Sequence, residues 1–358
     1  MRIFCDRGNF SLNSRAPERT AMPATPAPLR IGILGTANIA RSFVQGVSAS
    51  NQVTVGAIAS RDAGKARSFA QESGIARHFG SYEALLADRE IDAVYVPLPN
   101  SLHAEWSIRA ARAGKHVLCE KPLCATADEA RAMFDAAHRH GVHLVEGYPY
   151  RAQPQTLKLG ELLSAGAIGE VRLIQASFGF TLGAGENIRL SPQLAGGALM
   201  DVGAYPVSLA RMIAGSRAAR VFAVAQWAGG VDRALAATLQ FARGLFAQIS
   251  CSFSACSHRQ ALIAGSRGVI QTTYLNHTTV PSEAVLKLRV GTDKDALDST
   301  VQTSAVNGFL AEAESFARLV RGGPAHWCGT TPEESIDIML TLEAILKSAR
   351  SGAAIEIP

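Results

Sequence analysis

Apolar and amphipathic segments alternate regularly from Leu29 to about Gly147, and this pattern constrains the fold more than any other feature. Short apolar segments such as LRIGILG and VTVGAIAS are each followed by a stretch with apolar residues at helical spacing, of which IARSFVQGV is the first. IDAVYVPLP is almost continuously apolar, as is typical of a parallel strand covered on both faces. The alternation therefore predicts a doubly wound α/β fold with a parallel sheet, which binds ligands at the carboxyl ends of its strands.

The second half of the chain has a different pattern. Segments such as VRLIQASFGF, RVFAVAQWA and LFAQISCSF follow one another with turn residues between them. We therefore expect an α+β domain with a large, mostly antiparallel open sheet, closed by two C-terminal helices. Thr331 is expected to cap the second of these helices, with Pro332 in its first turn. The predicted divisions are an N-terminal arm over 1–28, a doubly wound domain over 29–150 and the α+β domain over 151–358.

Composition argues against several classes of protein. The 358 residues suffice for two domains, and the 47% of hydrophobic residues provide a core for each. No run approaches the roughly 18 apolar residues of a membrane span, and the net charge of +5 is not gathered into a basic run, so neither a membrane nor a nucleic acid is expected as a partner. The six cysteines suit a reducing cytoplasm better than a disulfide framework, and their C-x4-C spacings argue only weakly for a metal. Met1 and Met22 are both possible translation starts.

The first predicted strand ends in a turn of the kind that binds phosphate. GTANIA, from Gly35 to Ala40, follows a strand and opens a helix, and it matches G-x-G-x-x-A with Ala37 at the second glycine. Free N–H groups at the start of such a helix face a pyrophosphate. The second strand ends about 20 residues further on at Ser60 and Arg61, where NAD enzymes place an acid. A hydroxyl and a guanidinium suit a 2′-phosphate, so we expect NADP rather than NAD. The alternative is an ordinary exposed arginine at a helix start.

The glycine turn and the end of the second strand together define the first set of candidate cofactor contacts. They are Gly35, Thr36, Ala37, Asn38, Ile39, Ser60, Arg61 and Lys65.

Five motifs in order resemble one family of enzymes. They read ILGTANIA, AIASRDAGKA, VPLPNSLHAEW, AGKHVLCEKPL and GGALMDVGAYP. Together they resemble the Gfo/Idh/MocA family of NAD(P)-dependent oxidoreductases, from about Leu29 to the C-terminus, and most of all the branch with glucose-fructose oxidoreductase, D-xylose dehydrogenase and dimeric dihydrodiol dehydrogenase. The resemblance implies an N-terminal Rossmann domain for NADP, and a second domain that binds substrate and forms a homodimer or homotetramer through the exposed face of its sheet.

The resemblance also implies the catalytic groups. Lys121 of EKP would reach the reacting oxygen, and Pro122 often follows a cis bond in the family. Asp201 and Tyr205 lie four residues apart and so on one helix face. Because a free tyrosine titrates near about pH 10, we expect the Lys121 ammonium within hydrogen-bonding distance to favour the phenolate, which then takes the substrate's hydroxyl proton. Asp201 would orient the substrate or the tyrosine and hold the lysine charged. A solvated turn at Lys121 and a buried structural tyrosine are the alternatives.

The family motifs supply a second set of candidate cofactor contacts. These are Pro97, Leu98, Asn100, His103, Glu120, Lys121 and Arg189. His103 is equally compatible with a structural role at a helix start. The sequence departs from the family at Gln153, where relatives often carry a histidine, and at Ile188, where a tryptophan often precedes the arginine. No metal site is expected.

Two functions remain open at this point. The first is an NADP-dependent dehydrogenase or reductase acting on the CH–OH group of a secondary alcohol or lactol, above all at C1 of a sugar, with a trans-dihydrodiol or a polyol as alternative substrates. The second is a sensor or regulator that binds NAD(P) without turnover. The presence of both Lys121 and Tyr205 favours catalysis.

Overall fold

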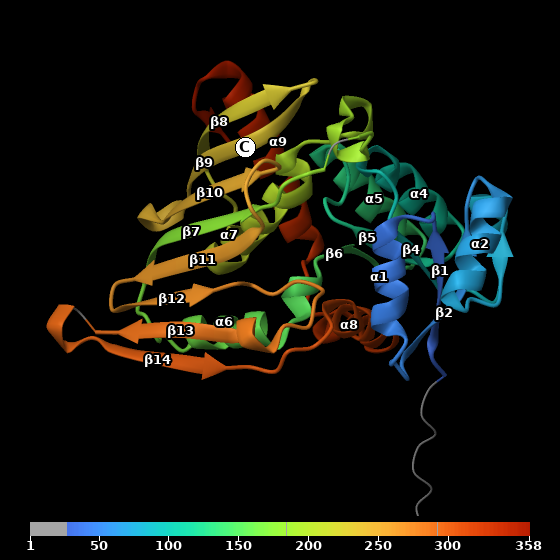
Figure 1. The fold of residues 1–358 in the computed structure, drawn as a ribbon, viewed down its shortest axis with the longest axis horizontal. Coiled ribbons are helices and arrows are strands. Elements are labelled where there is room, and N and C mark those ends of the chain that lie inside the picture. The colour runs from blue at the N-terminus through green and yellow to red at the C-terminus, as the bar shows by residue number, and fades with distance from the viewer. Residues whose placement is uncertain (1–26, 184, 292) are drawn as a thin grey trace, which may run out of the picture.

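The computed structural model describes residues 27–183, 185–291 and 293–358. Most of the predicted arm over 1–28, with both candidate start methionines, lies outside the described residues. Two sheets stand side by side, each with helices packed against it (Figure 1). Among the described helices, none is both long and apolar enough to cross a lipid bilayer.

The first sheet is parallel throughout, with strand order β3-β2-β1-β4-β5-β6. Its strands are β1 (Leu29–Leu34), β2 (Val53–Ala59), β3 (His78–Phe79), β4 (Ala93–Val96), β5 (His116–Glu120) and β6 (Leu144–Gly147). The helices between them are α1 (Asn38–Val47), α2 (Ala63–Ser73), α3 (Tyr82–Leu86), α4 (Asn100–Arg112) and α5 (Ala127–Arg139). All four residues of β4 are buried, as a strand between two helical layers requires. The predicted doubly wound sheet is confirmed.

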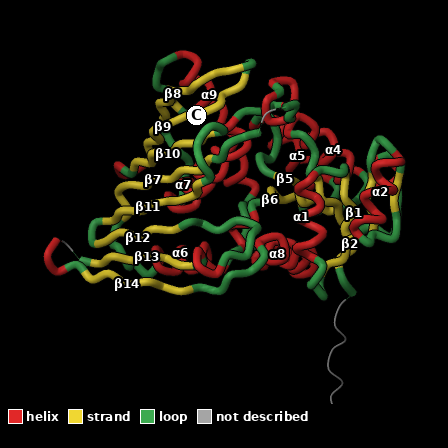
Figure 2. Tube along the Cα trace, in the orientation of Figure 1, coloured by secondary structure: helices red, strands yellow, loops and turns green. Residues whose placement is uncertain are grey.

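The second sheet has nine strands in the order β14-β13-β12-β11-β7-β10-β9-β8-β15 (Figure 2). Only the β7–β10 pair is parallel, so the mostly antiparallel prediction is confirmed. The strands are β7 (Val171–Gly179), β8 (Arg220–Ala228), β9 (Val231–Gln240), β10 (Phe246–Ser252), β11 (His258–Gly265), β12 (Gly268–Thr272), β13 (Val285–Val290), β14 (Leu297–Gln302) and β15 (Ile355–Glu356). Helices α6 (Pro154–Ser164), α7 (Ala204–Ala214) and α9 (Pro332–Ser351) pack against one face of this sheet.

Helix α8 (Gly308–Gly322) comes from the C-terminal half of the chain but packs against α1 of the first domain. Its Phe309 meets Phe43 edge to face, with ring centroids 5.8 Å apart, and Phe43 in turn stacks on Tyr95 at 4.1 Å. These rings are almost completely buried, so α8 shares a hydrophobic core with the first sheet. Helix α8 thus completes the core of the first domain although it follows residue 150 in the sequence. The domain division at residue 150 stays a prediction.

The segment SLHAEWSIRAARAG predicts a helix capped by Ser101, but α4 already begins at Asn100 with Pro99 at the cap position. The segment LFAQISCSFSAC predicts one strand that holds both Cys251 and Cys256, but β10 ends at Ser252 and the chain then bends. These two predictions are wrong. The spacing of Thr126 and Glu129 predicts a capping box, which forms at α5, and Thr331 caps α9 with Pro332 in its first turn as expected.

Candidate active site

A cavity of about 680 Å³ opens at the carboxyl ends of the first sheet's strands, where it meets the second domain. The first domain contributes the glycine turn, the β4–α4 loop and the EKP turn, as ligand binding at this edge of a doubly wound sheet requires. The predicted site residues on its wall are Gly35, Thr36, Ala37, Asn38, Ile39, Pro97, Leu98, Asn100, His103, Glu120, Lys121, Arg189, Asp201 and Tyr205. Segments far apart in the sequence thus meet in one place.

The glycine turn has the geometry of a phosphate-binding loop. Gly35 has a φ of +105°, and a Cβ at this position would lie 2.9 Å from Leu98 Cδ2, so a side chain is excluded. Ala37 stands at the cap position of α1, and no side chain caps the helix. The N–H groups of the first turn are therefore left for an anion. These residues fit the pyrophosphate of a dinucleotide.

Ser60, Arg61 and Lys65 do not line the cavity. Arg61 and Lys65 are exposed just beyond β2, whereas Ser60 is buried with its Oγ accepting from Asp62 N at 3.2 Å. Burial raises the pKa of Tyr82 and the Arg61 guanidinium acts against that rise, so Arg61 lies beside a tyrosine that does line the cavity. Arg61 therefore stands next to the cavity, and Lys65 lies in the first turn of α2.

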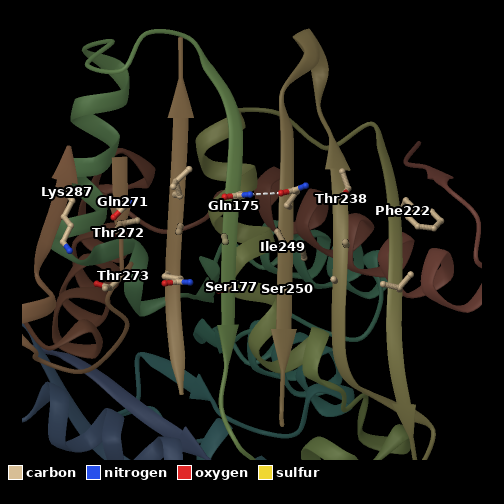
Figure 3. Close-up of a pocket in the computed structure, with 18 of the residues that line it drawn as sticks. Gln175, Ser177, Phe222, Thr238, Ile249, Ser250, Gln271, Thr272, Thr273 and Lys287 are labelled. Atoms are coloured by element: carbon tan, nitrogen blue, oxygen red, sulfur yellow. Dashed lines mark hydrogen bonds between the residues drawn. The ribbon is translucent and has the colours of Figure 1, made fainter. Parts of the chain in front are cut away.

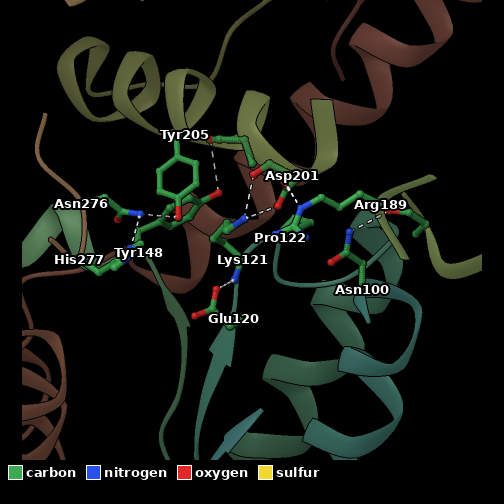
Figure 4. Close-up of polar contacts among 12 residues, drawn as sticks. Asn100, Glu120, Lys121, Pro122, Tyr148, Arg189, Asp201, Tyr205, Asn276 and His277 are labelled. Carbon is green, nitrogen blue, oxygen red and sulfur yellow. Dashed lines mark hydrogen bonds and ion pairs between the residues drawn. The ribbon is translucent and has the colours of Figure 1, made fainter. Parts of the chain in front are cut away.

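Lys121 enters the cavity from the turn after β5, and its bond to Pro122 is cis. Its Nζ donates to the carbonyl oxygen of Asp201 at 2.9 Å and to Asp201 Oδ1 at 3.0 Å (Figure 4). Arg189 Nε donates to the other oxygen, Asp201 Oδ2, at 2.6 Å. One carboxylate therefore binds two cations.

The charges of this cluster support one another. Burial opposes the charge on Asp201, but Lys121 and Arg189 outweigh burial and lower the pKa of the carboxyl. Burial also opposes the charge on Lys121, and Asp201 above all reverses this effect and raises the pKa of the ammonium. Lys121 is therefore a permanent cation at the edge of the cavity.

Tyr205 is 5% exposed and lies beside this cluster, but the expected hydrogen bond from Lys121 is not formed. Lys121 Nζ lies 5.0 Å from the centroid of the Tyr205 ring, because Asp201 holds the ammonium. The Tyr205 hydroxyl instead accepts from Asn276 Nδ2 at 2.9 Å. Burial raises the pKa of Tyr205 to about 12, against the opposing effects of Lys121 and Asn276.

Asp201 and Tyr205 are not separated by a regular α-helical turn. Residues Leu199–Gly203 form a π-helical segment, and α7 begins only at Ala204. Asp232 Oδ2 accepts from Leu199 N at 2.7 Å and so fixes the start of this segment. A π-helical turn widens the helix by one residue, which moves a side chain off the regular helical face and recurs at functional sites.

Three predicted contacts have structural partners of their own. Asn100 Nδ2 donates to Ala195 O at 2.8 Å and links the two domains at the cavity edge. The buried His103 ring lies between the carbonyl oxygens of Leu98 (2.7 Å) and Pro122 (2.9 Å), so it ties the two cofactor-side loops together. Glu120 accepts from the Tyr95 hydroxyl at 2.5 Å, and burial raises the pKa of this carboxyl.

The sequence predicts a pocket wall near Phe178 to Arg189, and Phe178 and Phe180 at the end of β7 do line the cavity. Asn276 and His277, which lie in the loop after β12, were not predicted. These two residues belong to no motif and show no periodicity, so no signal in a single sequence marks them. Gln153, which departs from the family pattern, donates through Nε2 to Asn276 O at 2.5 Å and so reaches this same loop.

Comparisons with known proteins agree with this geometry. Residues 29–148 match the model of the oxidoreductase family with NAD-binding Rossmann fold, and residues 156–271 match the GFO/IDH/MocA C-terminal domain. D-xylose 1-dehydrogenase (NADP(+)) 2 of Haloferax volcanii is 40% identical over 92% of this chain and 100% of its own. Trans-1,2-dihydrobenzene-1,2-diol dehydrogenase of Danio rerio is 34% identical over 82% of this chain and 89% of its own.

A solved structure is similar over the same extent. KijD10, a 3-ketoreductase from Actinomadura kijaniata in complex with NADP and TDP-benzene, has a TM-score of 0.80 at 31% identity and covers 90% of this chain and 98% of its own. A two-domain nicotinamide-dependent oxidoreductase is the class that the fold and the cavity define. The chain belongs to the Gfo/Idh/MocA family, so the resemblance seen in the sequence is confirmed, and it is an oxidoreductase rather than a sensor.

Proposed function

We propose that this protein is an NADP-dependent dehydrogenase or reductase that transfers a hydride between the nicotinamide and a secondary alcohol or lactol carbon, in the first place C1 of a sugar. The observation that carries the proposal is the cluster of Lys121, Asp201 and Tyr205, which lines the same cavity as the glycine turn. A fixed cation beside a buried phenol is suited to moving one proton to or from a reacting hydroxyl.

In the oxidative direction, Tyr205 as phenolate takes the proton of the substrate hydroxyl, and the electron pair of the O–H bond forms the C=O bond while the C–H pair leaves as hydride. A bound NADP⁺ would supply the acceptor for this hydride at its nicotinamide ring. The Lys121 ammonium stabilises the negative charge that develops on the substrate oxygen, and Asp201 keeps that ammonium charged and in place. The proton on Tyr205 is released to water afterwards, and reduction follows the reverse path.

The cofactor in this proposal is NADP. Arg61 and Lys65 are exposed just beyond β2, and Ser60 and Arg61 stand at the strand end where NAD enzymes place an acid. Asp62, the next residue, is also exposed, and its Oδ1 caps α2 by accepting from Lys65 N at 3.0 Å. A guanidinium at an exposed rim suits a doubly charged phosphate.

A sugar is the favoured substrate because of the remaining wall. Phe178 and Phe180 supply apolar ring surface, and Asn276, His277 and Arg189 supply polar groups, the mixture that a compact polyhydroxylated ligand needs. The similarity to a D-xylose 1-dehydrogenase supports oxidation at C1.

We also propose that the protein forms a homodimer or homotetramer through the open face of the second sheet. A shallow hollow of about 810 Å³ lies on this face, lined by side chains of several strands, such as Gln175 of β7, Gln248 of β10, and Phe222 and Val224 of β8 (Figure 3). Phe222 and Val224 are 47% and 59% exposed, which is unusual for apolar residues in the middle of a strand.

Two further proposals concern the chain as a whole. The matched family models on either side of residue 150 support the proposed domain division. The unpaired thiols of the described residues support a cytoplasmic location.

The test is an assay of NADPH formation over panels of aldoses, polyols and trans-dihydrodiols. We expect turnover of at least one aldose, and a fall of more than a hundredfold in kcat for Tyr205→Phe and for Lys121→Ala, while both variants still bind NADPH. Turnover of dihydrodiols alone would replace the sugar with the alternative substrate. Wild-type turnover in Tyr205→Phe with cofactor binding intact would refute the role of the tyrosine.

A further inference from the structure

We propose that Asn276 is a positioning residue that orients the Tyr205 hydroxyl and stabilises its phenolate form, an inference that rests on the proposed role of Tyr205 as the acid–base group. Asn276 Nδ2 donates to the Tyr205 hydroxyl oxygen at 2.9 Å (Figure 4). Within the described part of the chain, Asn276 is the only residue that makes a hydrogen bond to this oxygen. A donor aimed at a phenol oxygen binds the phenolate more strongly than the phenol, because the acceptor is then charged.

The Asn276 side chain is not arranged for stability. It is 5% exposed, and its amide nitrogen lies 2.9 Å from the Tyr205 hydroxyl and 3.3 Å from His277 Nδ1. Its carbonyl oxygen Oδ1 is buried, and no group among the described residues hydrogen bonds it. An unpaired buried acceptor costs free energy that an apolar side chain of similar size would avoid. An amide at this position is therefore better explained by what its nitrogen does to Tyr205.

The main chain beneath Asn276 is held from helix α6 and the turn before it. Gln153 Nε2 donates to Asn276 O at 2.5 Å and to Val306 O at 3.0 Å, and Gln155 Oε1 accepts from Leu275 N at 2.8 Å. Gln153 and Gln155 are fully buried. Two glutamines thus fix the backbone on both sides of the Leu275–Asn276 peptide. The position from which the Asn276 side-chain amide extends toward Tyr205 is therefore fixed as well. This preorganisation is what a positioning group requires.

The surroundings of the tyrosine explain why a neutral donor matters. Burial disfavours the phenolate, and Glu120 and Asp201 add negative charge, so the pKa of Tyr205 is raised to about 12 although Lys121 and the Asn276 hydrogen bond both act to lower it. The titratable and charged groups near the Tyr205 hydroxyl or its amide partner are Tyr95, Glu120, Lys121, Tyr148, Tyr150, Asp201, Arg259, Tyr274 and His277. None of these described side chains hydrogen bonds the hydroxyl, which leaves Asn276 as the direct partner.

The primary experiment reads the titration of Tyr205 without turnover. Protein with carbon-13 label in its six tyrosines is titrated by NMR as the NADP⁺ complex, and the Tyr205 signal is identified by its loss in Tyr205→Phe. Because a hydrogen bond to a charged group is lost, Asn276→Leu is expected to move the Tyr205 midpoint upward by about one to two pH units, which leaves tenfold to hundredfold less phenolate at a fixed pH below the midpoint. An unchanged or lowered midpoint would overturn the inference.

Two further variants complete the design. Thr303→Val is the matched control, because the Thr303 hydroxyl donates to Ala284 O at 2.8 Å and, among the described residues, hydrogen bonds neither Tyr205 nor the two glutamines, so the Tyr205 midpoint should stay at the wild-type value. Gln153→Leu removes the anchor of the Asn276 carbonyl, and a smaller upward shift is expected. If Asn276→Leu does not fold, Gln153→Leu takes its place as the test. An unmoved Tyr205 midpoint in Gln153→Leu would then count against the inference.

Kinetics separate this inference from the proposed function. The pH profile of kcat for oxidation should shift to higher pH in Asn276→Leu, with the KM for NADP⁺ unchanged, whereas a merely structural defect would lower kcat at every pH without moving the inflection. Full activity of Tyr205→Phe would refute the proposed function whatever the NMR midpoints show. Loss of activity in Tyr205→Phe, together with an unmoved midpoint in Asn276→Leu, would refute the role of Asn276 alone.

Discussion

Asp201 is the residue on which the charges of the cavity depend, since Lys121 and Arg189 both bind its carboxylate. With its ammonium on Asp201, Lys121 acts on Tyr205 through space at 5.0 Å from the ring rather than through a hydrogen bond. Asn276 supplies the direct contact. The electrostatic and the hydrogen-bonding influences on the tyrosine therefore come from different residues, and substitution can separate them.

The proposed preference for NADP depends on Arg61 and can be tested at that residue. Arg61→Ala is expected to weaken NADPH binding about tenfold or more and to leave NADH binding unchanged, because only the 2′-phosphate of NADPH would meet the guanidinium. Fluorescence titration with each reduced cofactor measures both affinities. Arg67→Ala is the control, because Arg67 is also an exposed arginine and lies on the nearby helix α2. This variant should change neither of the two affinities. Equal losses for the two cofactors, or no loss for NADPH, would show that Arg61 does not select NADP.

Which residues reach the site could be predicted only in part. Lys121, Asp201 and Tyr205 stand in family motifs, so the sequence led to them directly, and the structure places all three on the cavity wall. The contacts among these three residues could not be predicted from the sequence, because a π-helical segment before α7 changes the spacing between Asp201 and Tyr205. Asn276 was missed because its partner lies 71 residues away and the loop around it has no periodic pattern.

At the level of elements, the EKP turn is held between two buried side chains from its neighbours. Glu146 of β6 accepts from Leu123 N at 2.9 Å, and His103 of α4 lies against Pro122 O at 2.9 Å. Both side chains are completely buried. The position of Lys121 therefore depends on contacts from a strand and a helix that do not themselves touch the substrate.

Glu146 makes this support dependent on pH. Burial raises the pKa of Glu146 to about 7, above the value of about 4.3 in an unfolded chain. The folded state thus binds the proton more tightly, so the stabilising contribution is complete below about pH 4 and is lost as the pH rises to about 7. Glu146→Gln keeps an acceptor for Leu123 N without the charge, so it should raise the free energy of unfolding by up to about 3 kcal/mol at about pH 8, and by less at about pH 5.

Melting temperatures of Glu146→Gln and of the wild type at the two pH values check this expectation. Glu161→Gln, which removes a carboxylate from an exposed surface pair with Lys158, is the control and should show the same small effect at both. A stability change in Glu146→Gln that is equal at the two pH values would contradict the assignment of a buried, proton-binding carboxyl.

The elements themselves were predicted to different degrees, and for a physical reason. Helices α2, α5 and α9 carry caps and helical periodicity, and β1 and β5 are compact apolar runs, so local sequence determines them. Strands β11 and β14 were not recognised, since HRQALIAG and LDSTVQ have few apolar residues on their exposed faces. These strands form because neighbouring strands offer backbone hydrogen bonds, and a single sequence does not show its neighbours.

At the scale of the whole molecule, the two faces of the second sheet differ. Helices α6, α7 and α9 cover one face, whereas the other is open along its central strands (Figure 1). The polar side chains Gln175 of β7 and Gln248 of β10 are joined there by a hydrogen bond of 2.9 Å, and β8 exposes Phe222 and Val224 on the same face. The cavity lies at the junction with the first domain and shares no described lining residue with the hollow on this face. A partner bound to the open face would thus not replace a wall of the cavity.

The open face therefore makes a prediction that is independent of the chemistry. In a symmetric pair the same surface is buried on both subunits, so Val224→Arg would bury an unpaired charge on each of them, which should weaken self-association by a hundredfold or more at a cost of about 3 kcal/mol. Sedimentation of the wild type and the variant over a range of concentrations measures this. Leu157→Arg places the same charge at an exposed apolar position of α6, outside the hollow, and should leave the assembly intact. A monomeric wild type, or an unchanged assembly in Val224→Arg, would exclude this face as the interface. A monomeric Val224→Arg that still binds NADPH would show that the sheet joins subunits without contributing to the site.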